Sequence, residues 1–78
     1  GAKEVLSIEK TEVSDLSPLS DTSHLKSIFM RNSKVHRIAP IANLGNLRHV
    51  VVHLDQIQDA ELLKERDIWF GPDAPIAE

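Results

Sequence analysis

Residues 35–47 of the chain read VHRIAPIANLGNL, and their apolar side chains have counterparts 22 positions earlier in residues 13–25, VSDLSPLSDTSHL. The pairs that keep this spacing are Val13 and Val35, Leu19 and Ile41, Leu25 and Leu47, Ile28 and Val50, Met30 and Val52, and Pro18 and Pro40. Ile57 and Leu63 continue two of these series into a third unit. A fixed period of about 20 to 29 residues is typical of a solenoid, because one unit cannot bury its apolar face alone. The period therefore predicts a stack of repeated units.

Each unit begins with apolar residues in alternation, which predicts a short strand. The alternating pairs are Leu6 and Ile8, Ile28 and Met30, and Val50 and Val52. Pro18 and Pro40 are acceptable in the first turn of a short helix or 3₁₀ turn, which we predict for the return path. Residues 59–66 lack proline and predict a longer helix. A last strand is predicted at residues 68–70, only 18 positions after the third strand, so that the last unit is shortened.

The expected organisation is a single domain over residues 1–78. Its repeats cover about residues 3–24, 25–46 and 47–66, and a truncated last unit covers residues 67–71. The glycine and prolines that follow predict a loose tail over residues 72–78.

The sequence resembles the leucine-rich repeat family, in the 22-residue form of internalin-like bacterial proteins. Residues 35–47 are the closest match, and residues 13–19 repeat their opening. The resemblance implies an α/β solenoid with a parallel sheet on the concave side, and 3₁₀ or short helices on the convex side. It also implies protein binding. The chain departs from the family at Thr11, Ser33 and Asp55, where the family places asparagine, and at Thr22, where the second repeat has Leu44.

Composition limits the classes of partner. The chain has 78 residues, with nine Lys and Arg against twelve Asp and Glu, and a formal net charge of -3. No run of basic residues is present, so nucleic-acid binding is not expected. The chain has no cysteine and no apolar stretch of about 18 residues, which excludes disulfides and predicts no membrane insertion. The compartment is weakly constrained, and we favour a cytoplasmic location for the chain as given.

The side chains between the inward-facing strand residues must point to the opposite, concave face. The predicted central column there is Ser7, Phe29, Val51 and Trp69, flanked by one column of Val5, Ser27, His49 and Asp67 and another of Glu9, Arg31, His53 and Gly71. We expect Phe29, Val51 and Trp69 to be exposed anchors for a partner, with Arg31, His49 and His53 as polar contacts. The alternatives are that Trp69 and Phe70 cover the open end of the core and that Phe29 lies under a terminal segment or under a neighbouring molecule in a crystal. For Phe29 and Val51 we favour exposure.

Catalytic and metal sites are not expected. On a strand, His49 and His53 would stand about 13 Å apart, too far for one metal ion. His24 and His36 fall in turns, without ligands at a suitable spacing. The sequence has no phosphate-binding glycine loop and no nucleophile elbow, and no cofactor is expected.

The sequence therefore predicts a non-enzymatic protein-protein interaction module whose partner is unidentified. Two alternatives stay open: a small bacterial immunity or antitoxin-type inhibitor, and a structural repeat segment of a longer adhesin or sensor. Self-association through uncapped ends is a further expectation, because the first strand has an open edge. Whether the chain is complete or a fragment is also left open.

Overall fold

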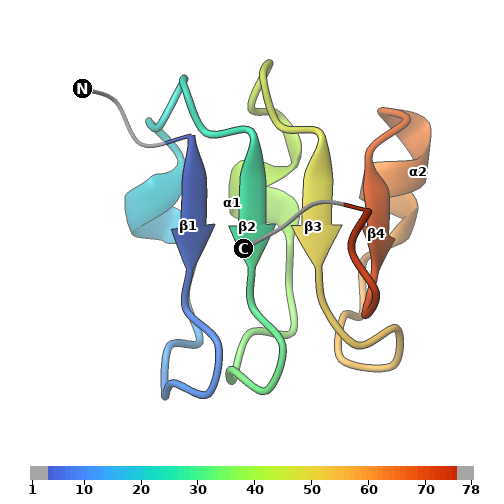
Figure 1. Ribbon diagram of the computed structural model, residues 1–78. Coiled ribbons are helices and arrows are strands. Elements are labelled where there is room, and N and C mark those ends of the chain that lie inside the picture. The colour runs from blue at the N-terminus through green and yellow to red at the C-terminus, as the bar shows by residue number, and fades with distance from the viewer. Residues whose placement is uncertain (1–3, 76–78) are drawn as a thin grey trace.

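Each strand of the protein pairs in parallel with the strand of the next unit. The computed structural model describes residues 4–75. Its elements, in chain order, are β1 (Val5–Ser7), η1 (Ser17–Leu19), β2 (Ser27–Phe29), α1 (Ala39–Ala42), β3 (His49–Val51), α2 (Glu61–Glu65) and β4 (Trp69–Gly71). The sheet has the order β1-β2-β3-β4, and the three helical segments lie behind it (Figure 1). The chain is thus an α/β domain with a four-stranded parallel sheet, as predicted.

The strand register follows the sequence period through the first three units. Val5 is opposite Ser27, and Ser27 is opposite His49, so that each step advances by one full period of the sequence. The last step is two positions shorter, because His49 is opposite Trp69. The spacing in the structure is thus 20 positions, from His49 to Trp69, whereas the sequence predicts 18. The prediction is wrong by two positions, and β4 places different residues on the face of the sheet than predicted.

The core lies between the sheet and the helical segments. Ile28 and Val50, at the centres of β2 and β3, are fully buried, and Leu6 and Phe70 pack against the same cluster from the outer strands. The following inward positions, Met30 and Val52, are fully buried as well. The period-2 alternation therefore identifies the core face of these strands.

Small hydroxyl side chains close the turns after β1 and β2. Thr11 Oγ1 donates to the carbonyl of Ile8 at 2.6 Å, and Ser33 Oγ donates to the carbonyl of Met30 at 2.8 Å. These hydroxyls satisfy backbone carbonyls where the chain leaves the strands. In the third unit the hydrogen bond comes from Gln56, the neighbour of Asp55. The side-chain amide of Gln56 donates to the turn of the second unit, where the carbonyl of Val35 accepts at 3.1 Å.

Carboxylates hold the starts of two helical segments. Asp59, from the third unit, accepts from the backbone amides of Ile38 and Ala39 at 2.8 and 3.1 Å, and so caps α1 of the second unit. In the first unit Asp15 accepts locally from Ser17. The hydroxyl and then the amide of Ser17 hold the pKa of the Asp15 carboxyl below its usual range.

The helix predicted over residues 59–66 is confirmed only in part. α2 covers Glu61–Glu65, because Asp59 serves as the cap of α1 and the chain leaves the helix before Asp67, whose φ is +57°. Pro18 and Pro40 do lie in the first turns of η1 and α1, as predicted. Among residues 4–75 the longest helix is α2, and none of the helices is long enough to span a bilayer.

The first unit covers its apolar residues less well than the second. Val13 is 38% exposed, whereas Val35, at the equivalent position, is fully buried. Leu6 and Ile8 are partly buried, whereas Ile28 and Met30 are fully buried. The first unit has a neighbour on one side only, since β1 is at the edge of the sheet.

We expect Val35→Ala to lower the free energy of unfolding by about 2 kcal/mol, because it leaves a cavity between two units. Val13→Ala, the same change at the equivalent position of the first unit, should cost no more than about 0.5 kcal/mol because that position is exposed. Urea denaturation of both variants measures the difference. Equal losses would contradict this description of the stack.

Candidate functional site

The face of the sheet opposite the helices, called the front face below, carries two rows of side chains. The upper row contains Val5, Ser27, His49 and Trp69, and the lower row contains Ser7, Phe29, Val51 and Gly71. Neither row belongs to the core cluster behind the sheet. The front face is thus the sheet face on which the sequence predicts the contact residues, with β4 shifted by two positions.

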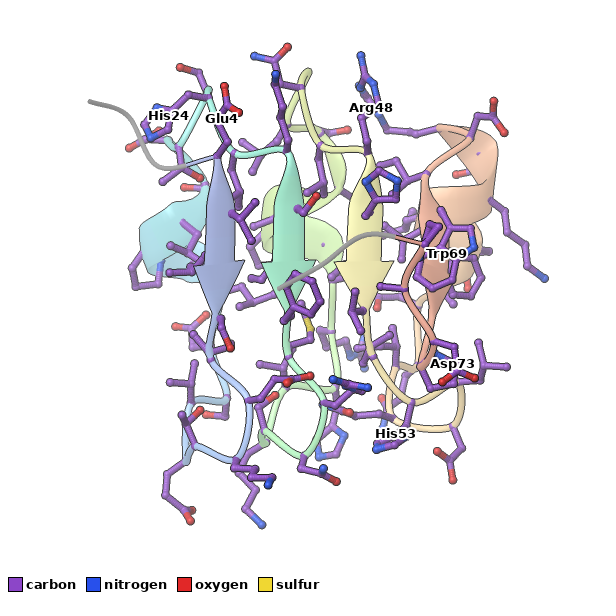
Figure 2. The ribbon with its side chains drawn as sticks, in the orientation of Figure 1. Glu4, His24, Arg48, His53, Trp69 and Asp73 are labelled. Atoms are coloured by element: carbon purple, nitrogen blue, oxygen red, sulfur yellow. The ribbon has the colours of Figure 1, made fainter. Side chains whose placement is uncertain are left out.

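Trp69 is not in the row in which it was predicted. Its backbone is opposite His49, and Gly71 takes the place next to Val51. The indole nevertheless reaches the lower row: a Cβ atom on Gly71 would lie 3.4 Å from the indole Cζ2 and Cη2. Figure 2 shows Trp69 in front of β4. The ring therefore occupies the space that a larger residue at position 71 would fill.

The predicted exposure of Phe29 and Val51 is wrong. Phe29 is 3% exposed and Val51 is fully buried, although no helix lies on this side of the sheet. The chain reverses after β4, and residues 72–75 run back in front of it (Figure 1). The alternative of a terminal segment over this face and the expectation of a loose tail over residues 72–78 stay predictions. Residues 76–78 lie outside the described part of the chain.

Three residues of the upper row form a continuous contact. Ser27 Oγ lies 3.3 Å from His49 Nδ1, and the ring of His49 lies 6.3 Å from that of Trp69 at an interplanar angle of 52°. Ser27 is 3% exposed, while His49 and Trp69 are half-buried. The imidazole thus contacts the hydroxyl on the neighbouring strand β2 and lies beside the indole on β4.

A nucleophilic serine needs a base that is itself oriented by a third group. Within residues 4–75, no carboxylate is hydrogen-bonded to His49. The arrangement can hold a polar group of a partner beside an aromatic ring.

Arg31 connects the sheet to the segment after β4. Its guanidinium pairs with Glu9 through Nε and Oε2 and through Nη2 and Oε1, the latter pair at 3.2 Å. Its Nη1 donates to the carbonyl of Pro72 at 2.9 Å. Glu9 and Arg31 are one period apart in the sequence, so this ion pair is one more contact between equivalent positions. Arg31 is half-buried in this network.

His53 is exposed just beyond the end of β3, on the same side of the molecule as Asp73 (Figure 2). Of the predicted contact residues, the structure thus groups His49 with Trp69 and ties Arg31 to Glu9 and Pro72. Among residues 4–75, no three Asp, Glu or His side chains are placed to hold a metal ion. These residues also enclose no pocket.

The sequence pattern does not identify two participants. Ser27 falls in a flanking column without a predicted role, although its position one period before His49 is a direct signal for contact on neighbouring strands. Pro72 falls in the predicted tail, and no periodicity marks it, because it follows the last repeat. Its contact depends on the reversal after Gly71, whose φ of +158° is rarely adopted by other residues.

Comparison with known proteins returned no match to this chain, whether with family models, curated proteins or solved structures.

We expect Phe29→Ala to lower the free energy of unfolding by about 3 kcal/mol, since it removes a buried aromatic ring. The matched control is Val5→Ala on the same sheet face, at a position that is exposed at the edge. Urea denaturation should show a change of no more than about 0.5 kcal/mol for the control. If both variants are as stable as the wild type, Phe29 is exposed in solution.

Proposed function

We propose that the chain is a short leucine-rich repeat module that binds a protein partner through its front face, without catalysis. The observation that carries this proposal is the row of side chains on the front face. Parallel pairing of equivalent positions aligns Ser27, His49 and Trp69 in one row and leaves this face without a layer of helices. A row of a hydroxyl, an imidazole and an indole offers both hydrogen bonding and apolar contact.

The solenoid part of the proposal is supported by contacts that join equivalent positions of consecutive units. Arg31 pairs with Glu9, and Ser27 contacts His49, both across one period of the sequence. Gln56 and Asp59 reach from the third unit into the turn and the helix of the second. A stack of repeats stabilises itself through such nearest-neighbour interfaces.

Trp69, His49, Arg31 and His53 are the proposed contact residues. Trp and Arg are the side chains most enriched among the energetically dominant residues of protein interfaces. Phe29 and Val51 lie beneath the surface and support it. They could contact a partner only after a rearrangement that exposes them.

The test is capture of a partner from extract of the source cells by the double variant His53→Ala, Trp69→Ala. We expect about tenfold weaker capture than by the wild type, as for the loss of one interface anchor. The matched control, His24→Ala with Val13→Ala, also removes one histidine and one apolar side chain, but neither lies on β3 or β4. Circular dichroism shows first that each variant is folded. Equal capture by both double variants would contradict binding on the front face.

The open end of the stack favours a second candidate, a structural segment within a longer repeat array. Val5 and Val13 are both exposed in the first unit, whereas Val35, the counterpart of Val13, is fully buried. A further unit packed against β1 would cover them. A longer reading frame with more units of the same period next to residue 1 would support this second candidate.

A further inference from the structure

The two edges of the sheet differ in how well they are protected from pairing with another strand. Among the described elements, β1 contacts only β2 and lies at one side of the sheet (Figure 1). Its residues Val5–Ser7 contain neither lysine nor proline, which commonly protect an edge strand from pairing with another chain. An edge of this kind can bind one more strand through its backbone.

The outer edge of β4 is closed by its backbone. β4 hydrogen-bonds to β3 through Trp69 and Gly71, so the residues just before and just after this pair face outward. Of these, Ile68 donates its amide to the carbonyl of Leu63 at 2.9 Å, and Pro72 has no amide hydrogen. β4 therefore lacks the series of outward donors that a further strand would need, which disfavours head-to-tail stacking of copies of the chain.

The backbone of Val5 and Ser7 faces away from β2. The amide of Ile8 donates to the carbonyl of Phe29 at 2.8 Å, so the even-numbered residues of this segment pair with β2 and the odd-numbered ones face outward. Val5 is 39% exposed, and Leu6 and Ile8 are only partly buried. The β1 edge thus offers backbone donors and acceptors beside incompletely covered apolar side chains.

A second copy of the chain is complementary to this edge in the antiparallel orientation. With Ser7 opposite Ser7 of the second copy, Leu6 of each chain lies opposite Ile8 of the other, on the core side of the sheet. Val5 lies opposite Glu9, whose carboxylate is held within its own chain by an ion pair. The apolar pairs extend each core toward the other.

The same register brings opposite charges together at both ends of the contact. Glu4, at the start of β1 (Figure 2), has an exposed carboxylate. Lys10 is also exposed and lies where the segment after β1 turns, with a φ of +59°. Glu4 of each copy lies opposite Lys10 of the other, so the complementary pair occurs twice.

We propose that the β1 edge binds a second copy of the chain, with the two β1 strands antiparallel and Ser7 at the twofold axis. The two sheets then form one continuous sheet with both front faces on the same side, because directly opposite residues of an antiparallel pair point to the same face. The assembly is a closed dimer, since each copy uses the same edge. This edge is separate from the row of Ser27, His49 and Trp69, so the dimer does not depend on the proposed function.

Sedimentation equilibrium over a range of protein concentrations tests the stoichiometry. We expect the mean mass to rise from that of one chain and to level off at twice that value. Ser7→Pro removes one backbone hydrogen bond from each half of the contact and should weaken dimerisation about tenfold or more. The matched control Ser7→Ala keeps the amide and should dimerise like the wild type. Circular dichroism shows first that each variant is folded.

Charge reversal tests the register and does not depend on whether the proline variant folds. Glu4→Lys and Lys10→Glu should each weaken the dimer about threefold or more, because each brings like charges together. The double variant should recover most of the wild-type affinity. Glu4→Lys also removes the ion pair of Glu4 with Lys26 in both the single and the double variant, so that pair cannot account for a recovery.

Amide hydrogen exchange locates the contact in the wild type. The amides of Val5 and Ser7 should exchange more slowly as the concentration rises, whereas that of Ile8, which donates to β2, should be protected throughout. A mass of one chain at every concentration overturns the proposal, as do species larger than a dimer and a dimer that a folded Ser7→Pro variant still forms with wild-type affinity. A double charge variant no tighter than the single ones overturns it too. A reading frame that places a further unit before residue 1 would also overturn it, because that unit would occupy the same edge.

Discussion

Parallel pairing of equivalent residues, 22 positions apart, is the constraint on which the rest of the structure depends. Because Leu6, Ile28 and Val50 are opposite one another, their side chains lie on one face and form a continuous core with the helical segments behind the sheet. The same register aligns the intervening side chains on the front face. A shift by one residue would exchange the two faces, so the apolar pattern fixes the pairing.

Polar side chains reinforce this register by satisfying backbone groups of the neighbouring unit. Asp59 caps α1 from the unit that follows it, and Gln56 binds the turn after β2. A hydrogen bond from a neutral amide side chain contributes roughly 0.5 to 1.5 kcal/mol, and one to a charged carboxylate contributes roughly 1.5 to 3 kcal/mol. These contacts link the third unit to the second, in addition to the apolar packing. The outer units have fewer such neighbours, which explains the exposure of Val13.

The sequence predicts the parts of the structure that repeat. The period places β1, β2 and β3 in register, and the prolines at positions 18 and 40 mark the helical segments behind them. It fails where repetition ends. β4 pairs two positions away from the expected register, and so Trp69 moves to the row of His49. The period also does not predict the burial of Phe29 and Val51 on the face of the sheet that carries no helix.

Duplication of one unit tests the central claim most directly. A second copy of residues 25–46, inserted after Asn46, should add one strand and one helical segment in the same register. We predict cooperative urea unfolding with a higher midpoint than the wild type, because an additional interface between units is formed. A control insert of the same length and composition in scrambled order should lower the midpoint. Loss of cooperative unfolding in the duplicated chain, as in the scrambled one, would contradict a stack of equivalent units.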